Sequence, residues 1–337
     1  MSAPSRLRAR TPIMVPGISV ILVIGAGLLF AAPASAQPFP QKPIHVVVPY
    51  APGGITDVIA RALAQRLTEA WKQQVIVENK PTGAGIVGID SVAKSPPDGH
   101  TLLVAADAAL VTAPHTYSKL PYHPERDFMA VTGLGISPQA LIVHPSVPAR
   151  TLSDLIEVAK KRPGELNYGT FGIATSGHLN IVLLESMTGT KFTPVHYRGA
   201  TPALTDTVAG HIQMMIVSIG LVAQPWQAGQ LKVLGFGSTA RIAEFPDVPT
   251  LAESGLPGYE AGSWYGLFTP KGTPRDIVDK LNSETKRIFN DVQFREKALA
   301  PSFIYSIVSS PEDFAARIPR DSERWGNVIR DANIKVE

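Results

Sequence analysis

The stretch of sequence that decides the fold reads Ile44-His45-Val46-Val47-Val48-Pro49-Tyr50-Ala51-Pro52-Gly53-Gly54-Ile55-Thr56-Asp57. Its opening residues are mostly β-branched, which is typical of a strand buried on both faces of a parallel sheet. The prolines and glycines that follow predict a turn, and apolar residues at helical spacing then run from Ile59 to Trp71. A buried strand, a glycine turn and an amphipathic helix predict that the protein is built from βα units.

The same alternation of strand and helix continues along the chain. Further strands are expected at residues 75–77, 101–105, 141–143, 167–170, 212–217, 232–236 and 264–268. Helices are expected after the capping box of Thr151 and Asp154, near His178, at 274–290 and, capped by Ser310, at 311–332; residues 113–127 are expected to be irregular. Such repeats predict an α/β fold of open, mostly parallel sheets flanked by helices.

The first 36 residues carry the pattern of an export signal. Arg6, Arg8 and Arg10 form a basic start, residues 18–32 are an uncharged and mostly apolar run, and Ala34-Ser35-Ala36 supplies the small residues of a cleavage site. A retained membrane anchor is the alternative, but the run is short for a bilayer core of about 30 Å. We therefore expect residues 1–36 to be a signal peptide that is cleaved near Ala36.

Composition excludes several classes of site. The formal net charge of +3 comes from those three arginines, since the rest of the 337-residue chain has 28 basic and 28 acidic residues. It holds no basic cluster with interleaved aromatics, so a nucleic-acid partner is not expected. The absence of cysteine excludes disulfides, thiolate metal sites and cysteine nucleophiles. The eight histidines lack paired metal-ligand spacing, so we expect no metal site.

A glycine motif raises the question of a dinucleotide cofactor. Gly83-Ala84-Gly85-Ile86-Val87-Gly88 fits the dinucleotide-binding pattern, and Asp107 follows the next expected strand at the distance of a ribose-binding acid. However, four residues separate the preceding strand from the glycines, and Pro96 cuts the following helix short. An exported protein would also meet little free dinucleotide. We favour a plain glycine turn beside a ligand cleft and expect no cofactor.

Two turns predict anion-binding sites. Gly53 and Gly54 let the backbone approach a ligand closely, the helix behind them points unpaired N–H groups at the same place, and Thr56 adds a hydroxyl. Residues 172–178 offer a second helix start, with hydroxyls from Thr175 and Ser176. Tyr197-Arg198-Gly199-Ala200 opens a third helix. Two helix starts on separate lobes would clamp a small dianion, whereas Asp57 is interpreted as structural.

A series of short motifs runs along the chain: Ala51-Pro52-Gly53-Gly54 with Asp57 and Ala60-Arg61, Val77-Glu78-Asn79-Lys80-Pro81, Pro97-Asp98-Gly99, Leu120-Pro121-Tyr122, Val143-His144-Pro145-Ser146, Leu166-Asn167-Tyr168, Pro202-Ala203-Leu204-Thr205-Asp206, Pro246-Asp247-Val248-Pro249-Thr250 and Ser263-Trp264-Tyr265-Gly266-Leu267. With these motifs the sequence resembles a known family, the Bug or TctC-like extracytoplasmic solute receptors of tripartite tricarboxylate transporters. Together the motifs cover essentially all of residues 40–334.

The resemblance implies a non-catalytic, two-lobed periplasmic binding protein of type II-like fold, with the ligand cleft between the lobes. Residues 37–141 and 263–337 would form lobe 1, and residues 142–262 lobe 2. The expected partners are a small carboxylate (a dicarboxylate, a tricarboxylate or an acidic amino acid) and a two-component membrane permease, with the receptor itself a monomer in the periplasm. The ligand contacts implied by the resemblance are Gly53, Gly54, Ile55, Thr56, Ala106, Asp107, Gly172, Thr175, Ser176, His178, Tyr197 and Gly199.

Some residues leave alternatives open. Many relatives have an acid at the position of Val217, and a small residue at the position of Asp107. Asp107 could pair with the ammonium group of an amino acid ligand or could simply cap the helix that starts at Ala108. His178 could contact the ligand or complete a helix cap. The rival function is an exported α/β hydrolase that uses Ser176 and His178, although no nucleophile-elbow motif surrounds that serine.

Overall fold

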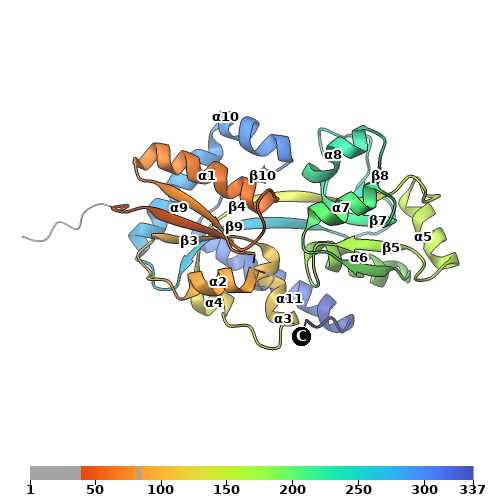
Figure 1. Ribbon diagram of the computed structural model, residues 1–337, viewed down its shortest axis with the longest axis horizontal. Helices are drawn as coiled ribbons and strands as arrows, with labels where there is room; N and C mark the ends of the chain where they lie inside the picture. The colour runs from red at the N-terminus through yellow and green to blue at the C-terminus, as the bar shows by residue number, and fades with distance from the viewer. Residues whose placement is uncertain (1–38, 82–84, 337) are drawn as a thin grey trace, which may run out of the picture. The chain divides into compact units, whose positions relative to one another are not determined.

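The computed structural model describes residues 39–81 and 85–336 (Figure 1). The expectations for the export signal and its cleavage lie outside these residues, as do those for Gly83 and Ala84. In the described part of the chain, no helix combines the length and the apolar character that crossing a membrane requires.

Ten strands of the described chain form one sheet in the order β2-β1-β3-β9-β4-β7-β5-β6, with β8 and β10 also paired to β4. Their bounds are β1 Ile44–Val48, β2 Val75–Asn79, β3 Thr101–Ala106, β4 Phe128–Val143, β5 Asn167–Thr170, β6 Thr193–His196, β7 Met214–Ser218, β8 Lys232–Phe236, β9 Gly262–Pro270 and β10 Tyr305–Ser306. The α/β class and the strands predicted from apolar runs are confirmed, although several are longer than expected.

The expectation of mostly parallel sheets is only partly correct. β1 pairs in parallel with β2 and β3, and β5 pairs in parallel with β6 and β7. The middle of the sheet is antiparallel, because β9 returns between β3 and β4 and runs opposite to both, and β4 also runs opposite to β7 and β8. The hydrophobic pattern of a strand does not show whether it runs parallel or antiparallel to its neighbours. The sequence therefore could not reveal that β9 is antiparallel.

The 16-residue strand β4 changes partners partway along its length. Up to Pro138 it pairs with β9, and from Gln139 onward it pairs with β7. Figure 1 shows β4 and β9 side by side in the middle of the sheet. The sequence prediction found only residues 141–143, because Gly133 and Gly135 resemble turn residues. A Cβ at Gly135 would lie 2.5 Å from the side chain of Ile304, so close packing requires glycine there.

Helices cover this sheet. The longer helices are α1 Ile55–Trp71, α2 Ile86–Ala93, α5 Leu152–Lys161, α6 Ser176–Thr188, α7 Ala200–Val208, α8 Ile219–Gln227, α9 Arg275–Asn290 and α11 Pro311–Asp331. The capping box of Thr151 and Asp154 and the Ser310 cap of α11 are confirmed. The shorter ones are Ala108–Thr112, α3 Ala113–Thr116, α4 Pro124–Asp127, α10 Val292–Phe294, Arg295–Leu299 and Ala300–Ser302.

The prediction of an irregular region at residues 113–127 was therefore partly wrong. Its two ends are helical, with Pro114 and Pro124 in the first turns of α3 and α4. Proline is tolerated in a first helical turn, where its missing N–H would have no partner. The same prolines made the sequence look like a loop.

The buried core has two parts, one around the strands on the β9 side of β4 and one around those on the β7 side. Two apolar clusters gather around β1, β3 and β9 beneath α1, α9 and α11, with Leu63, Val104 and Phe268 fully buried or nearly so. Two others gather around β5, β7 and the end of β4, with Tyr168 and Ile142 at their centres. The residues from Phe39 onward form one compact unit, and the division into two lobes stays a prediction.

Candidate ligand-binding site

A cavity of about 650 Å³ lies where β4 changes partners. Gln139 of β4, Ser218 at the end of β7 and Ser263 of β9 line it, and all three are nearly fully buried. Loops that follow β1, β3 and β5 complete its wall. A cavity at the carboxyl ends of parallel strands is the usual ligand position in an open α/β protein.

The structure brings most of the predicted contact residues to this cavity. The nine that line it are Gly54, Ile55, Thr56, Ala106, Asp107, Gly172, Thr175, Ser176 and Gly199. Among the described residues, three of the predicted contacts do not line it: Gly53, His178 and Tyr197. Each of these three has a structural contact instead.

Gly53 shapes the turn before α1. It has a φ of 85°, which a residue with a side chain rarely adopts, and its N–H donates to the Asp57 carboxylate at 3.0 Å. Burial alone would raise the pKa of Asp57, but hydrogen bonds from Arg61, Gly53 and Asn79 lower it below the usual value. The interpretation of Asp57 as structural is confirmed, because its carboxylate fastens the turn to α1 and β2.

His178 holds the loop that precedes α6. Its Nδ1 accepts a hydrogen bond from the Ala174 N–H at 3.1 Å, and burial lowers its pKa to about 4. Ala174 has a φ of 60°, a left-handed conformation that costs a non-glycine residue roughly 1 kcal/mol or more. The Ala174 carbonyl in turn accepts from the Thr112 hydroxyl at 3.0 Å. Hydrogen bonds to both the N–H and the C=O of Ala174 therefore hold this loop in its strained conformation.

Tyr197 points its hydroxyl at Asp206, to which it donates at 2.6 Å. Burial and this carboxylate raise the pKa of Tyr197 to about 12. The contact fixes the turn before α7, while the next residues, Arg198 and Gly199, line the cavity. Gly199 therefore lines the cavity, as the helix-start prediction expected, whereas Tyr197 does not line it and binds Asp206.

Four helices begin at the cavity wall. The N-cap residues of α1, α6, α7 and α8 are Gly54, Thr175, Gly199 and Ser218, and all four line the cavity. Within the described ranges, none of these helices has a side chain that accepts from its first N–H groups. Unpaired N–H groups and the positive ends of the helix dipoles therefore face the cavity, which favours a bound anion.

The structure shows one of the two roles that the sequence left open to Asp107, the helix cap. Its Oδ1 accepts from the Ala108 N–H at 2.9 Å and so caps the short helix Ala108–Thr112, and it also accepts from Ser263 Oγ at 2.8 Å. At the same time the residue lines the cavity and is only 7% exposed. Burial raises the pKa of this carboxyl to about 6, although the hydrogen bonds from Ser263 and Ala108 act in the opposite direction.

Several lining residues were missed by the sequence reasoning. The side chains that could contact a ligand are those of Tyr50, Tyr117, Tyr122, Gln139, Arg198, Ser218, Ser263 and Tyr265. Ser218 stands between a strand and a helix, the same position that singled out the predicted glycine turns. Gln139 is a polar residue inside an apolar strand, which was a usable signal. The tyrosines gave none, because aromatic residues are common in any core.

Two alternative chemistries gain no support from the geometry. In the glycine motif, a Cβ on Gly85 would lie 2.5 Å from the Pro49 carbonyl oxygen and one on Gly88 would lie 2.9 Å from Lys80, so packing accounts for both glycines. For the hydrolase, no hydrogen bond joins Ser176 and His178 among the described residues. The Nδ1 of His178 is already used by Ala174.

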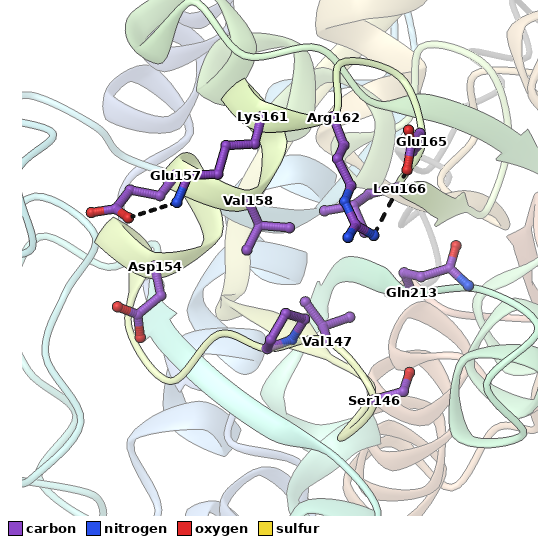
Figure 2. A pocket seen from close by; sticks show the side chains of 11 residues that line it. Ser146, Val147, Asp154, Glu157, Val158, Lys161, Arg162, Glu165, Leu166 and Gln213 are labelled. Carbon is purple, nitrogen blue, oxygen red and sulfur yellow. Dashed lines mark ion pairs between the residues drawn. The ribbon is translucent and has the colours of Figure 1, made fainter.

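A second hollow, of about 520 Å³, lies beside α5 (Figure 2). Four of its charged side chains form two ion pairs: Glu157 with Lys161 at 3.6 Å, and Arg162 with Glu165 at 3.9 Å. These groups are largely exposed to solvent. Since the predicted contact residues line the other cavity, this hollow is not the candidate site.

Fold and site together define a class of protein: an α/β solute-binding receptor of the periplasmic-binding-protein fold. The chain belongs to the family of tripartite tricarboxylate transporter receptors named TctC, whose model matches residues 59–334. This is a family of receptors and not of enzymes. The resemblance inferred from the sequence motifs is thereby confirmed.

Individual relatives agree with this assignment. The chain is 39% identical over 292 residues, 86% of each chain, to the UPF0065 protein in the tcbD-tcbE intergenic region of Pseudomonas sp. strain P51. Its structure is similar to that of R. palustris Rpa4515 with adipate, with a TM-score of 0.84, 32% identity, and coverage of 88% of this chain and 99% of that one. It is also similar to MatC from Rhodopseudomonas palustris with bound malate, with a TM-score of 0.78, 31% identity, and coverage of 86% and 100%.

Proposed function

We propose that this receptor binds a small carboxylate in the 650 Å³ cavity and delivers it to a two-component membrane permease. The observation that carries the proposal is the convergence of four helix N-termini without side-chain caps on one cavity. Such an array binds an anion through backbone N–H groups and needs no net positive charge, consistent with the balanced charge of residues after 36. The relatives solved with adipate and malate support a small carboxylate as ligand. Within that class we propose a dicarboxylate, a tricarboxylate or an acidic amino acid.

The carboxylate would lie between the first turns of α1 and α6. Thr56 and Ser176 line the cavity there, and each hydroxyl is a donor that adds to the backbone N–H groups. Gly53, His178 and Tyr197 would act indirectly by holding the loops in shape. Arg198, from the start of α7, supplies a cation at the same wall.

The position of the cavity suggests how the receptor captures its ligand. We propose that residues 37–141 with 263–337 and residues 142–262 act as two lobes that close around the ligand, with β4 and β9 as the shared strands. Closure would bring the starts of α1 and α6 to the same carboxylate. The receptor would act as a monomer in the periplasm after removal of residues 1–36.

The test is binding by the purified protein without residues 1–36. Small molecules released on denaturation are identified by mass spectrometry, and adipate, malate, citrate and glutamate are titrated calorimetrically. We expect at least one carboxylate to bind and to raise the unfolding temperature, because a ligand that binds only the native state stabilises it. Failure of every carboxylate to bind, with the protein folded, would contradict the proposal.

A further inference from the structure

We propose that the Asp107 end of the cavity is a site for a protonated amine, so that the ligand is an aminocarboxylate, a small molecule with a carboxylate at one end and an ammonium group a few carbon atoms away. The inference rests on the proposed function, because it assigns the second end of the same ligand. It names Asp107 as the residue that sets specificity.

The cavity wall contains two opposite charges that no protein group described by the structure neutralises. Among the described residues that line it, Asp107 and Arg198 are the charged ones, and they have opposite signs. No ion pair within the described ranges neutralises either of them. A nearly buried carboxylate without a cation is costly, and a ligand ammonium group removes that cost. A zwitterion whose carboxylate lies at the helix starts and whose ammonium lies at Asp107 complements both ends.

The hydrogen bonds of Asp107 leave room for such a ligand. The Ala108 N–H and Ser263 Oγ both donate to Oδ1, and the Trp264 backbone N–H also acts on this carboxylate, whereas an ionised carboxylate has about four acceptor positions. Gln139, on the β4 side of the cavity, offers a further group, because its amide oxygen is buried without a hydrogen-bond partner in the described part of the chain. An ammonium group has three N–H donors, which suits a site with unfilled acceptors.

A line of polar residues, partly joined by hydrogen bonds, runs across β9, β4 and β7 beside the cavity. Ser263 donates to Asp107, Ser263 is paired across the strands with Ser137, and the Ser137 and Ser218 hydroxyls are hydrogen-bonded. Gln139 lies two residues beyond Ser137 and so on the same face of β4. The polar line thus crosses from β9 to β7 at the point where β4 changes partners.

Two tyrosines share the cavity with the acid. Tyr50 and Tyr265 line the cavity, and besides burial the negative charge of Asp107 raises the pKa of both. Tyrosine ring faces attract an ammonium group. A second ligand carboxylate in the same place would meet the negative charge of Asp107, which disfavours it. The geometry therefore favours an amine over a second acid at this end.

The experiment compares ligands of matched length by calorimetry: adipate with 6-aminohexanoate, succinate with 4-aminobutyrate, and glutarate with glutamate. We expect the aminated member of at least one pair to bind at least about 30-fold more tightly to the wild type. The variant Asp107→Asn should lose that preference, because the amide has no charge. Asn and Ser both cap helices, so Asp107→Asn and Asp107→Ser are expected to fold, as thermal unfolding would verify.

Asp279→Asn is the matched control. Asp279 is an acid of α9 that binds Arg275, does not line the cavity in the described structure and is not among the groups that shift the pKa of Asp107, so its loss should leave the preference unchanged. A second readout is proton release at pH 6. With the Asp107 pKa about 6, pairing with an ammonium group should release about half a proton per ligand, and none in Asp107→Asn. Tyr50, Tyr265 and Asp321 also act on this carboxyl, and burial raises the pKa of both tyrosines, so neither ring releases a proton at that pH.

The outcomes separate this inference from the proposed function. Equal or tighter binding of the plain dicarboxylates, unchanged in Asp107→Asn, would overturn the ammonium site and leave the carboxylate receptor standing. An aminocarboxylate preference that survives both Asp107 variants would also overturn it. Failure of both ligand series to bind folded wild-type protein would contradict the proposed function, and this inference with it.

Discussion

Helices that begin at the cavity differ from helices that begin elsewhere in whether a side chain accepts hydrogen bonds from their first N–H groups. α5 and α11, away from the cavity, have Thr151 and Ser310 as N-caps whose side chains accept those hydrogen bonds. α6, α7 and α8, at the cavity, have in their described residues neither a side-chain cap nor an acid in the first turn. α9 lacks a side-chain cap but has Asp276 in its first turn. The chain leaves positive helix ends unsatisfied where a ligand can supply the acceptor.

The short helix Ala108–Thr112 sharpens the contrast. It too begins at the cavity, but its N-cap is the carboxylate of Asp107. One side of the cavity therefore presents free N–H donors and the other a capped helix start with a negative charge. This difference predicts a ligand with two chemically unlike ends. The substitutions below test the comparison between capped and uncapped helix starts.

The largest effect is expected for Gly54→Asp at the start of α1. A Cβ on Gly54 meets only the Ala51 carbonyl oxygen, at 3.8 Å, so the side chain fits and can cap the helix. It should stabilise the ligand-free protein by roughly 0.5 kcal/mol and weaken carboxylate binding about 100-fold, because it fills the anion site with a like charge. Calorimetric titration and urea unfolding measure the two effects. The control Gly54→Ala adds the Cβ alone, and an equal loss of affinity in it would contradict the explanation.

The next effect concerns the pH dependence of stability through His178. Burial lowers its pKa to about 4, below the ordinary value of 6.5, so the unfolded chain binds a proton first as the pH falls. The contribution of this group is complete above pH 6.5 and is lost progressively as the pH falls toward 4, by about 2.5 kcal/mol once the pH reaches about 4.5. Urea unfolding at several pH values should show a smaller loss in His178→Gln than in the wild type. His211→Gln, at an exposed site, serves as the control and should behave like the wild type.

Ser176→Ala tests a single donor at the start of α6. The hydroxyl lines the cavity, and a hydrogen bond to a charged ligand group contributes about 1.5 kcal/mol, so affinity should fall about 10-fold. Ser146→Ala, in the hollow of Figure 2, removes a hydroxyl that does not face this cavity and should leave affinity unchanged. Equal affinities in the wild type and Ser176→Ala would remove this hydroxyl from the site.

Thr151→Ala should have the smallest effect, and on stability alone. It deletes the side chain that accepts from the Asp154 N–H in the capping box of α5, which should cost about 1 kcal/mol of unfolding free energy. Carboxylate affinity should not change. A change of affinity would show that the two groups of helix starts are coupled, contrary to the comparison.

The sequence predicted the parts of this molecule whose residues carry a local signal. The β-branched run of β1, the Thr151 capping box and the glycine turn before α1 each reflect the conformation of a few neighbouring residues. Only the end of β4 was predicted, because its glycines and Pro138 resemble turn residues. The structure shows that Gly135 is required by close packing against Ile304, a residue far away in the sequence. Contacts between distant segments leave no such local pattern.

The candidate site divides in the same way. Helix starts such as Gly54 and Ser176 could be found from the sequence, because a helix N-terminus and its donors are local features. Gln139, Ser218 and Ser263 could not be assembled, since their proximity depends on the change of partners along β4. His178 was assigned to the ligand or to a cap, and only the structure shows it bonded to Ala174.

The most direct test of the central claim is a crystal structure of the receptor with the carboxylate that it binds. The account predicts a carboxylate oxygen within about 3.2 Å of backbone N–H groups in the first turns of α1 and α6. A ligand carboxylate bound by the Arg198 side chain alone, with both helix starts left unoccupied, would contradict it.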